Sequence, residues 1–175
     1  MGGGTLFPSN MAMAATDDSS LAYEQGKITA LEARALGVQI TFSPVMDINN
    51  NPDNPIINFR AYSDNPETVS KFGSAFIKGA QDNGLIACAK HFPGHGNTAT
   101  DSHTSLPTIK TSRSELEKLE LQSFKAAINA GVKMIMVGHI ALPGLDESGD
   151  PASHSSAITT NLLRNEMGFG GIIIT

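Results

Sequence analysis

Amphipathic stretches and short apolar runs alternate along this chain. Apolar residues at helical spacing predict helices over residues 19–36, from the Asn65-Pro66 pair to Gly84, from Ser112 to Gly131, and over 160–167. Continuous apolar runs predict strands over 38–42, 85–89, 132–140 and 171–175. Because these runs do not alternate with polar residues, they are typical of a parallel sheet covered on both faces. The order of elements predicts an α/β fold.

Local signals mark the helix ends. Pro66 stands at the first helical position after Asn65, with an acid, Glu67, in the first turn. Ser112 and Glu115 have the spacing of a capping box. These signals support the predicted starts of the second and third helices.

The connections between elements differ in length according to their direction. Helix-to-strand links are short and contain glycine, whereas the links from strand to helix, 47–64, 91–111 and 141–159, are long. The long links carry nearly all the histidines, and parallel strands place such links at one edge of the sheet. This distribution predicts an active-site edge on a (β/α) barrel or an open α/β sheet, with about four of the eight units of a barrel.

Composition narrows the functional classes. A chain of 175 residues with 40% hydrophobic and 17% charged residues is typical of one globular domain. The formal charge of −5 argues against nucleic acid or an anionic membrane surface as partner. We find no membrane-spanning segment and no secretory leader in this sequence, which leaves the compartment, cytoplasmic or periplasmic, open. The single Cys88 lies in an apolar run and is interpreted as a buried thiol.

Residues 90–103 carry the candidate chemistry. Lys90 and His91 follow an apolar run, so the ammonium needs an acceptor, either a ligand hydroxyl or the Asp47 carboxylate. Asp101 is two residues from His103, so it can fix the tautomer of the ring and leave its Nε2 to transfer a proton, although a capping Asp beside a solvated His has the same spacing. Arg60, in the preceding long link, is a candidate donor to a polar ligand.

A metal centre is the alternative use of these histidines. His91, His95, Asp101, His103 and His139 include residue types that bind metals at strand ends. However, Pro93-Gly94 separates His91 from His95 and prevents the helical spacing that makes a good chelate. We therefore predict no metal and no other cofactor, and interpret Gly94-His95-Gly96 as a tight turn.

These motifs resemble the signature of glycoside hydrolase family 3, and specifically its β-N-acetylhexosaminidase branch. The resemblance extends over essentially the whole chain, 1–175, which is similar to a single partial N-terminal catalytic domain. The segments that carry it are KHFPGHGNT at 90–98, DSH at 101–103, FSPVMDIN at 42–49, NP at 54–55, NFR at 58–60, MVGHI at 136–140 and LLRNEMGFGG at 162–171.

The resemblance implies a partial TIM-type barrel and a set of roles. It assigns acid/base catalysis to His103 with its partner Asp101, sugar-hydroxyl binding to Lys90 and His91, and substrate contact to Arg60. The implied reaction is retaining hydrolysis of a terminal β-linked N-acetylglucosaminide, as in the turnover of peptidoglycan fragments. The implied partner is this carbohydrate alone, with no nucleic acid and no obligate protein partner.

This sequence departs from the family pattern at two places. Asn97 stands where the family usually has Asp. The family nucleophile is an Asp immediately after the strand that 171–175 resembles, and the first strands of the barrel are also missing. We therefore expect these 175 residues alone to be inactive. Open alternatives are a β-glucosidase, β-xylosidase or phosphorylase of the same family, a non-catalytic sugar-binding protein, and a metal hydrolase.

Overall fold

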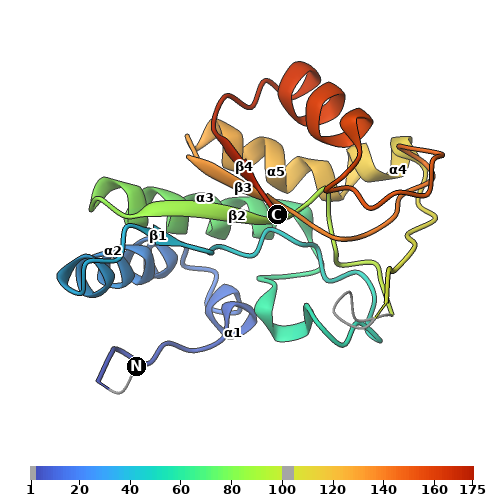
Figure 1. The fold of residues 1–175 in the computed structure, drawn as a ribbon. Helices are drawn as coiled ribbons and strands as arrows, with labels where there is room; N and C mark the ends of the chain where they lie inside the picture. The colour runs from blue at the N-terminus through green and yellow to red at the C-terminus, as the bar shows by residue number, and fades with distance from the viewer. Residues whose placement is uncertain (1–2, 100–104) are drawn as a thin grey trace.

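In the computed structural model, which describes residues 3–99 and 105–175, four parallel strands form one sheet with helices packed along it (Figure 1). The strands are β1 (Ile40–Thr41), β2 (Ile86–Phe92), β3 (Met134–Val137) and β4 (Ile172–Ile174). The helical elements are α1 (Asn10–Ala14), α2 (Ser20–Ala35), the 3-10 turn η1 (Asn58–Arg60), α3 (Pro66–Asp82), α4 (Arg113–Lys118), α5 (Glu120–Asn129) and the π-helix η2 (Ala157–Glu166). The predicted α/β class is confirmed.

The order of the strands identifies the kind of α/β sheet. Each strand pairs in parallel with the next one along the chain, in the order β1-β2-β3-β4. A doubly wound sheet reverses its order at a switch point, whereas a (β/α) barrel adds each strand beside the previous one. The described sheet therefore has the topology of part of a barrel wall.

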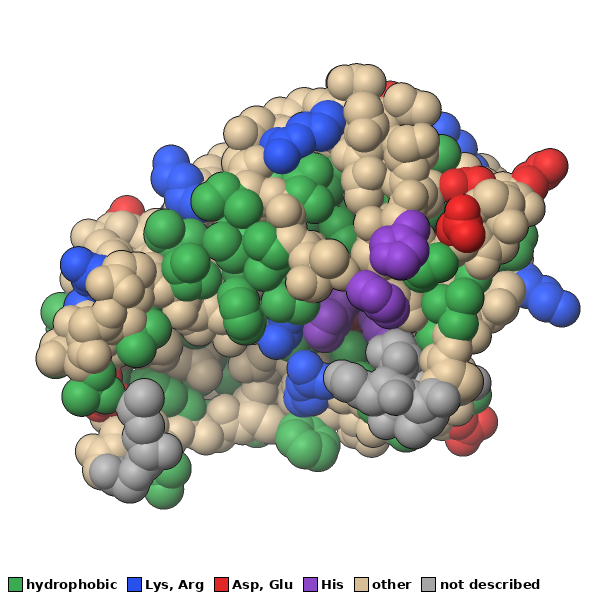
Figure 2. Space-filling model, in the orientation of Figure 1, with side chains coloured by type: hydrophobic (Ala, Val, Ile, Leu, Met, Phe, Trp, Pro, Cys, Tyr) green, Lys and Arg blue, Asp and Glu red, His purple; other side chains and the backbone are tan. Residues whose placement is uncertain are grey.

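The two faces of the sheet have different environments. Ala87, Ala89 and Ile135 are fully buried and share one core cluster with Phe72 of α3 and Phe124 of α5. On the opposite face, hydrophobic side chains reach the surface (Figure 2), and the edge-strand residues exposed there are Ile40 (38%) and Ile172 (51%). Of the described residues on this face, Cys88 and Met134 in the central strands are buried, so the expectation that both faces are covered holds there and is wrong at the edge strands. In a barrel, side chains on this face pack against strands from across the barrel.

The predicted starts of the second and third helices are confirmed in atomic detail. The Asn65 side chain accepts hydrogen bonds from the N–H groups of Glu67 and Thr68. Both halves of the capping box between Ser112 and Glu115 are formed. No described helix is long and apolar enough to cross a membrane.

Several element bounds differ from the predictions. The helix expected from Ser112 to Gly131 is two helices, because Leu119 leaves helical geometry at φ −120° and ψ −85°. Strand β2 continues to Phe92, since its last residues pair with β3. The last helix begins at Ala157 instead of residue 160, where the Ser155 hydroxyl accepts the N–H of Ile158. Helix α1, only five residues long, is too short for helical periodicity to reveal.

The first residue of α5 is a buried acid. Glu120 is 2% exposed, and the Asn50 amide donates to its Oε1 at 3.2 Å, while no described group pairs with its Oε2. Burial is the main cause that raises the pKa of this carboxyl, and the nearby Asp47 carboxylate adds to the effect. Ionisation of Glu120 in the folded state is therefore unfavourable.

Replacing Glu120 by Gln should stabilise the fold by about 1 kcal/mol near pH 7.5 and by almost nothing near pH 4. The unfolded carboxyl ionises near its ordinary pKa of 4.5, whereas the folded one keeps its proton to higher pH, so wild-type stability falls as pH rises through this interval. Gln retains the acceptor for Asn50 and does not titrate. Urea unfolding across this pH range measures the difference. The matched change at exposed Glu147, to Gln, should leave the pH dependence unaltered; equal curves for wild type and E120Q would contradict the prediction.

Candidate active site

A hollow of about 430 Å³ lies at the carboxyl ends of β2 and β3. Two cations and three imidazoles line it together with apolar and small residues: Arg60, Lys90, His91, His95 and His139, with Ile56, Met136, Val137, Gly138 and Thr175. Figure 2 shows the histidine side chains gathered at one place on the surface beside Lys and Arg side chains. The described lining contains no carboxylate. The hollow therefore presents mainly hydrogen-bond donors and imidazole nitrogens to a ligand.

A buried carboxylate directly behind the hollow orients His91. Asp47 is fully buried, and its Oδ2 lies 2.8 Å from His91 Nδ1, while the His91 peptide N–H donates to the same carboxylate at 3.1 Å. Its Oδ1 also accepts the peptide N–H of His95 at 2.8 Å. Because an ionised carboxylate can only accept, Nδ1 of His91 carries the proton, and Nε2 is left for a ligand.

The charge on Asp47 is maintained by these partners. Burial by itself would raise the pKa of Asp47, but the His91 imidazole, its hydrogen bond and the His95 N–H outweigh burial and hold that pKa below its ordinary value. The carboxylate therefore stays ionised although it is out of contact with water.

The chain after β1 places Asp47 beside β2. The Cys88 N–H donates to the Ser43 carbonyl at 2.9 Å, and the Met46 N–H donates to the Lys90 carbonyl at 2.6 Å. This segment therefore runs alongside β2, beyond the two residues of β1 itself. The β2–β3 register shifts between Lys90 and Phe92, and such an irregularity redirects side chains, so consecutive residues Lys90 and His91 both line the hollow.

Lys90 does not use Asp47 as its acceptor. No hydrogen bond or ion pair joins these two described residues, because His91 and His95 occupy the carboxylate. Burial lowers the pKa of Lys90, and the nearby Arg60 guanidinium lowers it further. The alternative of a Lys90–Asp47 ion pair is therefore wrong, and the half-buried ammonium is available to a ligand in the hollow.

Arg60 is the last residue of the η1 turn and also lines the hollow. Its Nη1 donates to the Ile56 carbonyl at 2.9 Å, and its own carbonyl accepts from Asn10 Nδ2 at 2.7 Å. These bonds fix both ends of the residue. The structure thus brings together three of the sequence-predicted site residues, Arg60, Lys90 and His91.

The other two predicted residues, Asp101 and His103, lie outside the described residues. Asn97 and Thr111, on either side of this segment, are joined by a hydrogen bond from Asn97 Nδ2 to Thr111 Oγ1 at 3.3 Å. Among the described residues, no group of three His, Cys, Asp or Glu side chains is arranged to hold a metal ion.

Sequence reasoning missed His95 and His139 as lining residues. His95 was interpreted as part of a turn, yet it is 2% exposed. The centroids of the His95 and His91 rings are 5.8 Å apart, and the angle between the ring planes is 69°. Burial lowers the pKa of His95, so the ring is neutral near pH 7. The only signal for His95 was its spacing from His91. The signal for His139 was its position at the end of a predicted strand, as for Lys90 and His91.

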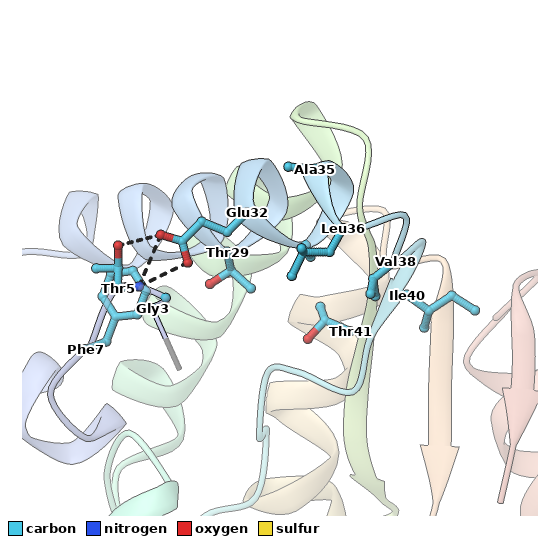
Figure 3. A pocket seen from close by; sticks show the side chains of 12 residues that line it. Gly3, Thr5, Phe7, Thr29, Glu32, Ala35, Leu36, Val38, Ile40 and Thr41 are labelled. Carbon is cyan, nitrogen blue, oxygen red and sulfur yellow. Dashed lines mark hydrogen bonds between the residues drawn. The ribbon is translucent and has the colours of Figure 1, made fainter. Parts of the chain in front are cut away.

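A second hollow, of about 620 Å³, lies on another part of the molecule. It is formed by the N-terminal segment, α2 and β1 (Figure 3). Its lining is largely apolar, including Phe7, Leu36 and Ile40, and its carboxylate, Glu32, accepts hydrogen bonds from the N–H and hydroxyl of Thr5. It lacks the imidazoles and cations found at the strand ends, so the smaller hollow is the candidate site.

Comparison with known proteins identifies the family of the chain. The model of the glycosyl hydrolase family 3 N terminal domain matches residues 1–175. The chain is 38% identical over 185 residues to "Beta-hexosaminidase A" of Pseudoalteromonas piscicida, covering 98% of this chain and 31% of that protein. It is 36% identical to "Beta-N-acetylglucosaminidase/beta-glucosidase" of Cellulomonas fimi, covering 95% of this chain and 31% of that one.

Solved structures agree with the fold. The chain superposes with a TM-score of 0.97 on a glycoside hydrolase family 3 beta-N-acetylglucosaminidase from Paenibacillus sp. str. FPU-7, at 44% identity, covering 99% of this chain and 33% of that one. The chain thus spans about a third of the length of each of these relatives. With a parallel sheet in barrel order and a family match along its whole length, this chain belongs to the glycosyl hydrolase family 3 N-terminal domain family.

Proposed function

We propose that the protein containing this chain is a retaining β-N-acetylglucosaminidase. The observation that carries the proposal is the convergence of Arg60, Lys90 and His91 on one hollow, with His91 oriented by the buried Asp47. Two cationic donors beside an imidazole acceptor suit an uncharged, hydroxyl-rich ligand, and the names of the relatives point to an N-acetylated sugar.

In the proposed reaction, His103 acts as the general acid and base, with Asp101 holding its ring. The protonated ring gives its proton to the glycosidic oxygen while an enzyme carboxylate attacks the anomeric carbon, so the bond to the leaving group breaks and a glycosyl ester forms. The neutral ring then takes a proton from water, which attacks the anomeric carbon and releases the sugar and the carboxylate.

The remaining residues bind the sugar. Lys90 and Arg60 donate to its oxygens, and Nε2 of His91 takes part in a further hydrogen bond. The nucleophile we propose is the Asp that follows the strand equivalent to β4 in the family pattern, beyond Thr175. The assays below therefore use the whole protein.

Replacing Asp47 by Asn should raise KM for 4-nitrophenyl N-acetyl-β-glucosaminide about 10- to 100-fold, the equivalent of one hydrogen bond to a charged group. An amide at this position offers one acceptor where the carboxylate takes three N–H groups, so His91 loses its fixed orientation. Steady-state kinetics measure the change. Because the pKa of Asp47 is depressed, its stabilising effect is present above its ordinary value of 3.8 and is lost as pH falls through the lower, folded value. The gap in unfolding free energy between wild type and D47N should close there.

Asp53, exposed in the same loop, provides the matched control. Asp53→Asn should leave KM unchanged. An unchanged KM in D47N, with the protein folded, would show that His91 does not bind the sugar in the orientation set by Asp47.

Replacing His103 by Ala should lower kcat/KM about 10²- to 10⁴-fold on an aglycone with a poor leaving group. The loss should be smaller on a dinitrophenyl glycoside, whose departure needs little proton donation, if bond cleavage limits the rate. Asp53→Asn, at the exposed acid absent from the described lining of the hollow, should again have little effect. Full activity in H103A would remove the residue from the mechanism.

The same assays separate the alternatives. Faster turnover of the β-glucoside than of the N-acetylglucosaminide would favour a glucosidase. The β-glucoside is the second substrate to test because the name of the Cellulomonas fimi relative includes both activities. Formation of sugar 1-phosphate with added inorganic phosphate would identify a phosphorylase. Loss of activity to a chelator would identify a metal hydrolase, and no turnover of any substrate with retained sugar binding would identify a binding protein.

A further inference from the structure

Two loops from different parts of the chain must keep a fixed separation for the hollow to bind one ligand. Arg60 comes from the loop after β1, whereas Lys90, His91 and His95 come from β2 and its continuation. The described hollow is therefore sensitive to whatever holds residues 54–60 against residues 91–96.

The side-chain amide of Asn54 joins these two loops with all of its hydrogen-bond donors and acceptors. It is 1% exposed, and its Nδ2 donates to the carbonyls of His95 at 2.9 Å and Gly96 at 2.8 Å. Its Oδ1 accepts the N–H groups of Ile56 at 2.9 Å and Ile57 at 2.8 Å. A primary amide has two donor hydrogens and two acceptor lone pairs, so this side chain has no capacity left over.

The acceptor side of Asn54 leads directly to Arg60. The carbonyl of Ile56 accepts from Arg60 Nη1, and the carbonyl of Ile57 accepts the Arg60 N–H at 2.8 Å. Thus the residues whose N–H groups are held by Asn54 are the ones whose carbonyls hold the arginine.

The donor side of Asn54 leads to the histidines. The His95 carbonyl belongs to the residue whose N–H is bonded to Asp47, and Asp47 in turn orients His91. The loop that contains His95 and Gly96 is packed tightly against the backbone of Ile48, because a Cβ on Gly96 would lie 1.5 Å from the Ile48 carbonyl oxygen. A displacement of Asn54 would therefore move the loop that carries Arg60.

We propose that Asn54 is a positioning residue of the sugar site, which sets the distance between Arg60 and the imidazoles and thereby the affinity of the hollow for the sugar. Asn54 does not line the hollow, so it acts through Arg60. The inference rests on the proposed function, because the ligand is taken to be an N-acetylated sugar.

Asn54→Asp is the selective test. Asp keeps an oxygen for the N–H groups of Ile56 and Ile57, but places a second oxygen against the carbonyls of His95 and Gly96, so it breaks only the connection between the loops. Asn54→Ala removes both sides and is the second variant if Asp prevents folding. Asn83→Asp is the matched control, since Asn83 Nδ2 also donates to a backbone carbonyl, that of Gly79, at the end of α3.

The readout is a double-mutant cycle on the Kd for N-acetylglucosamine, measured by titration calorimetry on the whole protein, with thermal unfolding to confirm that each variant is folded. N54D should raise the Kd about 10- to 100-fold in the wild-type background. In the Arg60→Ala background it should raise the Kd less than about threefold, since coupled positions are not additive. N83D should change the Kd in neither background.

The outcomes separate this inference from the function on which it rests. Folded N54D or N54A protein that binds as wild type, or an equal loss in both backgrounds, overturns the positioning role while sugar binding stands. A wild-type protein that binds no N-acetylglucosamine overturns both. A loss of affinity that occurs only in variants with a lowered melting temperature, and that N83D repeats, assigns Asn54 a purely structural role and also overturns the inference.

Discussion

The arrangement of the site depends on one buried carboxylate. Asp47 is out of contact with water, so its ionised form is tolerated only because three N–H groups from the end of β2 and the following turn point at it. Each of those groups is in turn fixed by Asp47: the ring of His91 in its tautomer and the backbone of residues 91–95 in its path. A single interaction therefore connects the loop after β1 to the strand that carries the ligand-facing groups.

The geometry of the sheet explains why cations gather there. Side chains alternate along β2, so Ala87 and Ala89 pack under the helices while Lys90 faces the other side, in register with Met136 and Ile174. That side is not covered by the described helices, and at the carboxyl ends of the strands it opens into the hollow. A lysine at this position keeps its stem against apolar neighbours and its ammonium at the site.

Local features of the fold were predictable, and those set by distant contacts were not. The caps at Asn65 and Ser112 are formed by neighbours within three residues, and the sequence shows them directly. The break at Leu119 has no glycine or proline to announce it, and we find no local cause for it. His95 was read as a turn residue because its neighbours are glycines; its burial against His91 depends on Asp47, which lies 48 residues earlier.

By itself, the sequence determined the order of helices and strands, the edge of the sheet that carries the polar residues, and the residue types available there. Those properties follow from periodicity, capping and the common direction of parallel strands, all of which are local or nearly so. Only the tertiary structure decided that Asp47 pairs with His91 and not with Lys90, and that Asn54 spans two loops. Partners separated by more than 40 residues are chosen by strand register and by competition for one acceptor, and neither is encoded in a local pattern of residues.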